Sequence, residues 1–191
     1  MADLRTSFDD ALATLGALLA ERGLRYELYA VGGGALQLLG LIRRPTKDID
    51  VAGLVEDGVI TPPRPMPAEL MAAVVAVAEL LDMSDDWMNA GPASLLDLGL
   101  PKGALERAVR REWQGLVLYL AGRTDQISFK LYAAVDQGPD SKHFSDLRQL
   151  EPTTDELLTA GRWARTHDPS DAFRDQLVRA LGDLGVSDAD V

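Results

Sequence analysis

The sequence VGGGALQLLGLIRRPTKDIDV, residues 31–51, sets three consecutive glycines and two nearby aspartates among strongly apolar neighbours. The segment that leads into it, RYELYAV (25–31), alternates in polarity and is rich in aromatic residues, which predicts a strand. Glycines between a strand and a helix allow a sharp turn and let a ligand approach the backbone amides, and a helix start favours an anion. The stretch therefore fits either a phosphate-binding turn or a tight turn that holds no ligand.

Two common phosphate-binding signatures are absent from this stretch. A P-loop requires a lysine followed by serine or threonine after its glycines, and no such pair follows them here. A dinucleotide-binding fingerprint requires a third, spaced glycine at the position that Gln37 occupies. The glycines therefore point to neither a P-loop nor a dinucleotide site.

Asp48 and Asp50 form the second chemical feature, a pair of carboxylates separated by Ile49. Residues two apart on a strand point to the same face, so both carboxylates are expected on one face while Ile49 is buried on the other. Two carboxylates this close repel one another unless a cation lies between them, and hard oxygen ligands suit Mg²⁺ or Mn²⁺. The alternative is a solvated sheet edge with two unrelated aspartates. Beside the glycine turn, however, the pair favours attack on the α-phosphate of a nucleoside triphosphate.

Hydrophobic periodicity predicts an α/β (α+β) protein with a small mixed sheet flanked by helices and a helical C-terminal half. A capping box is expected at Thr153 and Glu156, and a helix cap at Ser170. We expect a core over residues 1–122 and a helical region over 123–191, or one continuous domain. The expected strands are 25–31, 48–55 and 113–122, and the expected helices are 8–19, 35–42, 68–82, 125–136, 155–166 and 171–184.

The composition is that of an ordinary globular protein, with 191 residues of which 47% are hydrophobic and 26% charged. The absence of cysteine excludes a disulfide framework and a thiolate zinc site. No apolar run reaches the roughly 18 residues of a membrane span, and the first ten residues do not resemble a signal peptide. These features predict a cytoplasmic protein that does not cross a membrane.

The formal net charge of -11 argues against a nucleic-acid partner, but the charge is unevenly distributed. Residues 43–50 hold three basic and two acidic side chains, and residues 102–148 hold eight basic and six acidic ones. An anion-binding surface is therefore expected from these two segments. If the partner is a nucleic acid, Arg107, Arg110 and Arg111 are expected to contact it.

The stretch 31–51 resembles the signature of the nucleotidyltransferase superfamily, whose fold is that of DNA polymerase beta, in having a glycine motif followed by a D-x-D strand. It is more narrowly similar to the AbiEii/MenT group of toxin nucleotidyltransferases, whose members show G-G followed by R-x-T-x-D-I-D. DDWMN (85–89) resembles that group's W-L/M-N element. QISFKLYAAVDQGPDSKHFSDLRQL (126–150) resembles its K-L-x-A segment and the aspartate-leucine segment that follows.

The resemblance assigns roles to further residues. Lys130 is implied to contact the triphosphate and to neutralise the leaving pyrophosphate, and its alternative role is a lysine whose stem lies on apolar surface. Asp146 is implied to be either a third carboxylate or the partner that orients Lys130, and its alternative role is a surface aspartate on a helix. Both residues lie at the margin of a predicted apolar helix face.

The remaining residues of the expected nucleotide site precede the acid pair. Gly32, Gly33 and Gly34 are expected to cradle phosphate, Arg44 to clamp it and Thr46 to offer a hydroxyl. Gly34 departs from the family pattern, because it replaces the usual serine after the glycines. The hydroxyl contact to phosphate is then supplied by another residue or replaced by a backbone amide.

The resemblance implies a metal-dependent enzyme that transfers a nucleotide to an acceptor, with the tRNA acceptor end as the expected acceptor. In that group the enzyme is the toxin of a toxin–antitoxin pair, so a cognate antitoxin protein is an expected partner. The alternatives are transfer to a small hydroxylated molecule or to a protein, and a non-catalytic nucleotide-binding module of the same fold.

Overall fold

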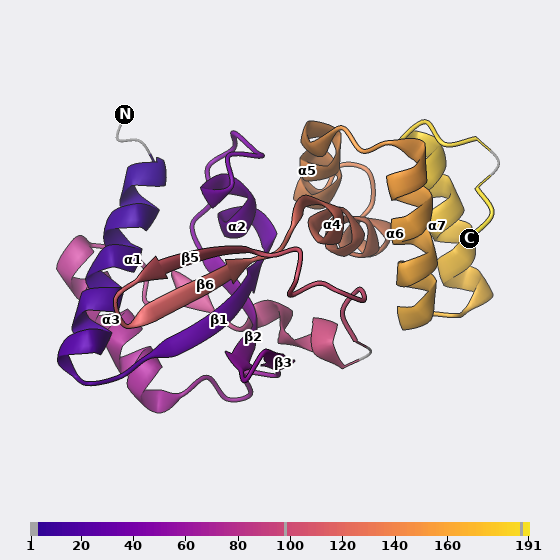
Figure 1. Ribbon diagram of the computed structural model, residues 1–191. Coiled ribbons are helices and arrows are strands. Elements are labelled where there is room, and N and C mark those ends of the chain that lie inside the picture. Colours follow the sequence, from indigo (N-terminus) through magenta and orange to yellow (C-terminus); the bar gives the residue numbers. More distant parts are fainter. Residues whose placement is uncertain (1–3, 98, 188) are drawn as a thin grey trace. The chain divides into compact units, whose positions relative to one another are not determined.

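The chain folds into two units, Met1–Ala121 and Gly122–Val191, of which the first carries the β-sheet and the second is helical (Figure 1). The computed structural model describes residues 4–97, 99–187 and 189–191. No helix in these ranges is long and apolar enough to cross a membrane.

The N-terminal unit is built on a mixed sheet with the strand order β3-β2-β1-β6-β5, and β4 pairs with β2 outside this path. The pairs β1–β6 and β2–β4 are parallel, and the other pairs are antiparallel. The predicted mixed α/β architecture is therefore confirmed. Its elements are α1 (Leu4–Glu21), β1 (Tyr26–Val31), α2 (Gly32–Leu38), β2 (Ile49–Glu56), β3 (Val59–Thr61), α3 (Ala68–Leu81), β4 (Met88–Asn89), the 3₁₀ helix η1 (Gly91–Leu96), β5 (Val109–Trp113) and β6 (Leu116–Leu120).

One face of this sheet packs against α1 and α3 to form the hydrophobic core. Alternate residues of β6, namely Leu116, Leu118 and Leu120, point into this core, as the period of two in a strand requires. Trp87 is fully buried, and its indole nitrogen donates to the Val74 carbonyl of α3 at 3.0 Å. The core therefore fixes the positions of β1, β2 and β4, which carry the candidate site.

Two local expectations were wrong. The segment 113–122 was expected to be a single strand, but Gln114 and Gly115 form a turn between β5 and β6. β5 was missed because its sequence, VRREW, is mostly charged. The helix expected over 35–42 is α2, which ends at Leu38, because Gly40 adopts a left-handed φ of 74° that terminates a helix.

The C-terminal unit consists of α4 (Arg123–Gln137), α5 (Lys142–Leu150), α6 (Thr154–His167) and α7 (Asp171–Asp183). The predicted capping box is confirmed, because Thr153 and Glu156 exchange backbone and side-chain hydrogen bonds. Ser170 also caps α7 as predicted, by accepting from the Phe173 amide.

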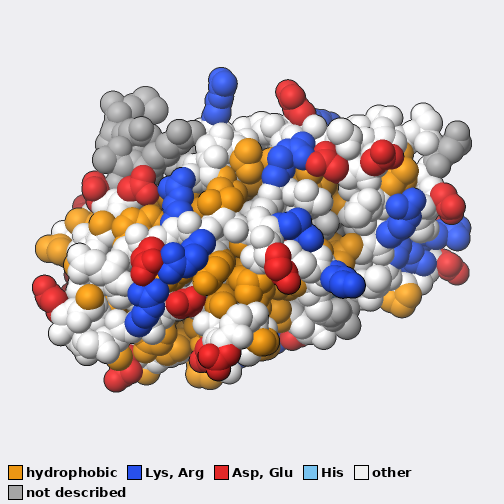
Figure 2. Space-filling view, viewed as in Figure 1, with side chains coloured by type: hydrophobic (Ala, Val, Ile, Leu, Met, Phe, Trp, Pro, Cys, Tyr) orange, Lys and Arg blue, Asp and Glu red, His pale blue; other side chains and the backbone are white. Residues whose placement is uncertain are grey.

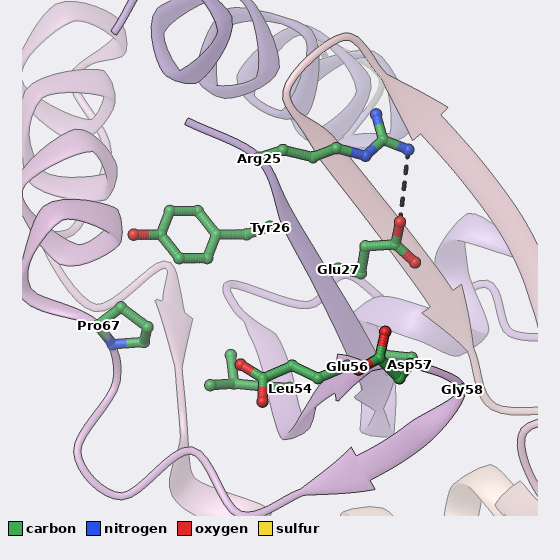
Figure 3. A pocket seen from close by; sticks show the side chains of 9 residues that line it. Arg25, Tyr26, Glu27, Leu54, Glu56, Asp57, Gly58 and Pro67 are labelled. Carbon is green, nitrogen blue, oxygen red and sulfur yellow. Dashed lines mark hydrogen bonds and ion pairs between the residues drawn. The ribbon is translucent and has the colours of Figure 1, made fainter. Parts of the chain in front are cut away.

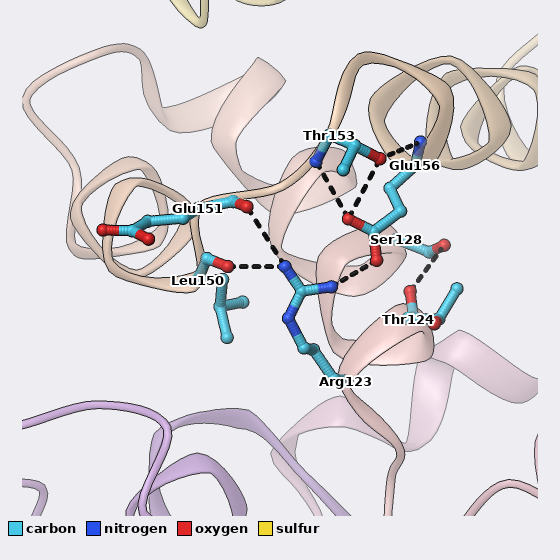
Figure 4. Close-up of polar contacts among 7 residues, drawn as sticks. All are labelled: Arg123, Thr124, Ser128, Leu150, Glu151, Thr153 and Glu156. Atoms are coloured by element: carbon cyan, nitrogen blue, oxygen red, sulfur yellow. Dashed lines mark hydrogen bonds and ion pairs between the residues drawn. The ribbon is translucent and has the colours of Figure 1, made fainter.

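Arg123 joins three helices of this unit (Figure 4). Its guanidinium donates to the Leu150 carbonyl at the end of α5 at 2.6 Å, to the Glu151 carbonyl at 3.2 Å and to the Glu156 carboxylate in the first turn of α6. A fixed guanidinium fork suits such a junction, because it offers several donors in one plane.

Aromatic contacts join α4, α6 and α7. The ring centroids of Trp163 and His167 lie 4.1 Å apart, and those of Phe129 and Trp163 lie 5.5 Å apart at a steep interplanar angle. Tyr132 contacts Trp163, His167 and Phe173. These contacts and the Arg123 junction join the helices of this unit, together with their buried apolar residues.

Candidate functional site

The candidate site of the N-terminal unit begins where β1 ends and β2 starts. Val31 is the register partner of Asp50 in this antiparallel pair. Gly32 follows directly, with a left-handed φ of 77°. A β-carbon on Gly32 would collide with the Asp50 carboxylate, so this position requires glycine both for its backbone conformation and for the close approach of Asp50.

Gly33 lies against Arg44 and Thr46. A β-carbon on Gly33 would stand 2.7 Å from the Thr46 methyl group and 2.8 Å from a terminal nitrogen of Arg44. The half-buried Arg44 side chain thus folds back onto the glycine turn. As a result, the carboxylate of Asp50 and the guanidinium of Arg44 lie against consecutive residues of one turn.

Gly34 allows α2 to pack closely on the start of β2. A β-carbon there would collide with the Asp48 carbonyl oxygen and would stand 2.7 Å from the Ile49 side chain. A serine has no room at this position. The glycine at this position, where the AbiEii/MenT pattern has a serine, therefore has a steric reason in this chain.

Asp48 precedes the first residue of β2, and its side chain is half-buried. Across the ranges that the structure describes, the Asp48 carboxylate makes no hydrogen bond or ion pair. A carboxylate without a protein partner is available to a cation, so Asp48 and Asp50 are the candidate metal ligands of this site. Among the same described residues, no group of three acidic, histidine or cysteine side chains gathers to hold a metal. Water and phosphate oxygens are the ligands that Mg²⁺ commonly adds to one or two carboxylates.

Thr46 is buried, and its hydrogen bonds go to Gln37 on α2. The Thr46 hydroxyl donates to Gln37 Oε1 at 3.0 Å, and the Thr46 amide donates to the same oxygen at 3.2 Å. Gln37 is also buried, with 5% of its surface exposed. The Thr46 hydroxyl, which was expected to contact phosphate, therefore donates its hydrogen bond to Gln37. Thr46 anchors the segment that leads into the acid pair.

Lys130 and Asp146 belong to the C-terminal unit, where α4 and α5 bring them together. The Lys130 ammonium lies 2.7 Å from Asp146 Oδ2, and both side chains are buried. The resemblance allowed Asp146 to be either a third carboxylate or the partner that orients Lys130, and this geometry supports the second role. The contact of Lys130 with a triphosphate stays a prediction.

Asn89 was not among the predicted site residues, although it belongs to the segment DDWMN that resembles the W-L/M-N element. In the parallel pair of β2 and β4, Asn89 is the register partner of Asp50, so the two side chains lie on the same face of the sheet. Asn89 Oδ1 accepts a hydrogen bond from the Gly91 amide at 2.8 Å. Asn89 therefore borders the acid pair.

The arginines expected to contact an acceptor do not share one surface. Arg110 is the register partner of Tyr119 and Arg111 that of Leu118, so they point to opposite faces of the sheet. Arg111 donates to the Leu38 carbonyl at the end of α2 at 3.0 Å. On the face shown in Figure 2, basic side chains are interspersed with acidic ones. The expectation that Arg111 shares one continuous basic surface with Arg110 was therefore wrong.

An open surface hollow of about 490 Å³ lies at the other end of the same strands (Figure 3). Arg25 and Glu27, which both line it, form an ion pair at 3.4 Å. It includes the first residues of β1 and the last of β2, whereas the acid pair lies at the opposite ends, roughly 15 Å away at the rise of a strand. This hollow is not part of the candidate site. Its lining residues are Arg25, Tyr26, Glu27, Leu54, Val55, Glu56, Asp57, Gly58 and Pro67.

Comparisons of the chain with protein-family models, with curated proteins and with solved structures give no match.

Proposed function

We propose that the chain is a metal-dependent nucleotidyltransferase whose N-terminal unit is a minimal nucleotidyltransferase core. The observation that carries this proposal is the contact of Asp50 and Arg44 with consecutive glycines of one turn. A carboxylate that can hold a cation and a guanidinium that can hold phosphate are the two charges that a nucleoside triphosphate with its metal requires. The sequence motif supports the same activity by resemblance.

The reaction proposed is transfer of a nucleotide to a hydroxyl acceptor. The acceptor oxygen forms a bond to the α-phosphorus, the bond from the α-phosphorus to the bridging oxygen breaks, and pyrophosphate leaves while the hydroxyl proton passes to water. Asp48 and Asp50 hold the Mg²⁺ or Mn²⁺, which when bound offsets the charge of the phosphates. Arg44 contacts the triphosphate beside Gly33. Lys130 is proposed, on the resemblance alone, to neutralise the leaving pyrophosphate.

The proposed acceptor is the acceptor end of tRNA, and the proposed role is that of a cytoplasmic toxin neutralised by a cognate antitoxin protein. The resemblance to the AbiEii/MenT group supports both. The surplus of basic side chains in 43–50 and 102–148 is small, which favours a short contact with the acceptor end over a contact with the whole tRNA.

The test is transfer of label from each of the four α-³²P-labelled nucleoside triphosphates with total tRNA, Mg²⁺ and Mn²⁺. Label should appear in tRNA with the wild type and be absent with Asp50→Asn. Glu56→Gln, at the exposed far end of the same strand, is the matched control and should stay active. Label in a protein or a small molecule would replace tRNA as acceptor. Nucleotide binding without any transfer would contradict the proposed activity and favour a non-catalytic module.

A further inference from the structure

Gln37 holds the segment that leads into the acid pair. It lies on α2, five residues after the glycine that contacts Asp50, and is 5% exposed. Its side-chain oxygen accepts from both the amide and the hydroxyl of Thr46, at 3.2 Å and 3.0 Å. An amide oxygen has two lone pairs, so one Gln37 atom satisfies two buried donors.

The connection between α2 and β2 has little regular structure of its own. Residues 39–48 contain a turn and a bend but no helix or strand. Arg44 and Asp48 both belong to this connection, and Thr46 lies midway between them. The amides of Leu39, Gly40 and Leu41 donate to carbonyls of α2. The part that follows has no backbone ladder, so side-chain hydrogen bonds help to hold it, and each must offset the conformational entropy of ordering it.

We propose that Gln37 is a positioning residue, which acts through Thr46 to set where Arg44 and Asp48 stand relative to the glycine turn. α2 then contacts the site at both of its ends. Its first residues lie against Asp50 and Arg44, and Gln37 in its last turn binds Thr46. This inference rests on the proposed function. Its consequence is that Gln37, which touches neither metal nor nucleotide, governs the metal affinity of the acid pair.

A merely structural role would predict a different result. Replacing Gln37 by leucine leaves two donors of Thr46 buried and unsatisfied, which destabilises the protein in either case. Only a positioning role predicts weaker metal binding by the protein that remains folded. Arg111→Ala is the matched control, because Arg111 holds the same helix through the Leu38 carbonyl but does not contact residues 39–48 in any hydrogen bond of the described chain.

The experiment measures Mn²⁺ affinity by electron paramagnetic resonance, together with amide hydrogen exchange of residues 43–48 by mass spectrometry, below the Tm of every variant. Gln37→Leu should weaken Mn²⁺ binding by about tenfold or more, as outer-shell substitutions at metal sites do, and should speed exchange over 43–48. Gln37→Glu should restore most of the affinity, because a carboxyl oxygen accepts the same two hydrogen bonds. Arg111→Ala should bind Mn²⁺ within about twofold of the wild type.

The outcomes separate this inference from the proposed function. If the wild type and Asp48→Asn bind Mn²⁺ equally, the acid pair is no metal site, and both proposals fail. If Asp48→Asn loses Mn²⁺ while Gln37→Leu binds it like the wild type, the inference alone fails. Equal losses of affinity in Gln37→Leu and Arg111→Ala would also overturn it, because the effect would then be general loosening of α2.

Discussion

The ammonium nitrogen of Lys130 lies 2.7 Å from Oδ2 of Asp146, and the two side chains are 4% and 0% exposed. Two charges removed from water this completely stabilise each other, and removing one of them takes from the other an opposite charge at 2.7 Å. We therefore expect Lys130→Met and Asp146→Asn each to lower the free energy of unfolding by about 3–5 kcal/mol. The double variant Lys130→Met/Asp146→Leu should recover much of this loss. Urea unfolding followed by circular dichroism measures all four proteins, and additive losses in the double variant would contradict the prediction.

Lys130 is also predicted to act on the triphosphate. Lys130→Ala, assayed well below its Tm, should lower kcat by on the order of 100-fold, because a charge that stabilises the leaving pyrophosphate is lost. Asp146→Asn keeps the lysine and should lower kcat less. Steady-state rates with the labelled triphosphate give both values. A rate for Lys130→Ala within about threefold of the wild type would leave Lys130 a purely structural residue.

Asp48 and Asp50 should be needed for activity and not for folding. Asp48→Asn and Asp50→Asn should each reduce transfer by roughly 100-fold or more, while Tm stays equal or rises because the repulsion between two carboxylates is relieved. Activity and melting temperature are measured on the same preparations. Full transfer by either variant would rule out a site made of two carboxylates.

The stability of the C-terminal unit should depend on the ionisation of Glu156. Burial raises the pKa of Glu156, but the hydrogen bonds from Thr153 and the ion pair with Arg123 outweigh it, so the pKa is lowered from its ordinary 4.5. A lowered pKa stabilises the folded state above the ordinary value, and this contribution is lost as the pH falls below 4.5 through the folded-state pKa. The difference in unfolding free energy between wild type and Glu156→Gln should therefore shrink as the pH falls below 4.5. A difference that is constant from neutral pH to about pH 3 would show that ionisation of Glu156 does not contribute.

Arg110 and Arg111 should behave differently, because they lie on opposite faces of β5. Arg111→Ala should lower stability by about 1 kcal/mol through loss of its hydrogen bond to the Leu38 carbonyl, and should leave tRNA use unchanged. Arg110→Glu should weaken tRNA use without changing the KM for the triphosphate.

Wild-type binding to tRNA should itself weaken as salt rises from about 50 to 200 mM. Neutralising Glu112, the exposed partner of Arg110, is a control for loss of their 2.7 Å ion pair. If Arg110→Glu modifies tRNA normally, or if salt has no effect on binding, a small-molecule or protein acceptor becomes the better proposal.

The features that the sequence predicted well depend on residues near one another in the chain. Thr153 and Glu156 are three residues apart, so the capping box and the helix it starts could be recognised without tertiary information. The strand that leads into the glycines, 25–31, was predicted for the same reason, because its alternation and the glycines after it are local signals. The glycine turn and the carboxylate pair were expected to be neighbours because only a short helix separates them in the sequence, and the close approach of Asp50 to Gly32 was found in the structure.

Tertiary structure alone decided the features whose partners are remote or whose face is ambiguous. The charged strand VRREW forms because it can pair with the edge of β6. Which of its arginines faces the core depends on the register, since a shift of one residue would turn every side chain to the opposite face. Asn89 borders Asp50 only because β4 pairs with β2. In the sequence, Gln37 is notable only because it stands where a dinucleotide fingerprint has a glycine. In the folded chain its buried Oε1 accepts hydrogen bonds from the amide and the hydroxyl of Thr46. Only the folding of the loop brings these buried donors, which must be satisfied, within reach of that oxygen.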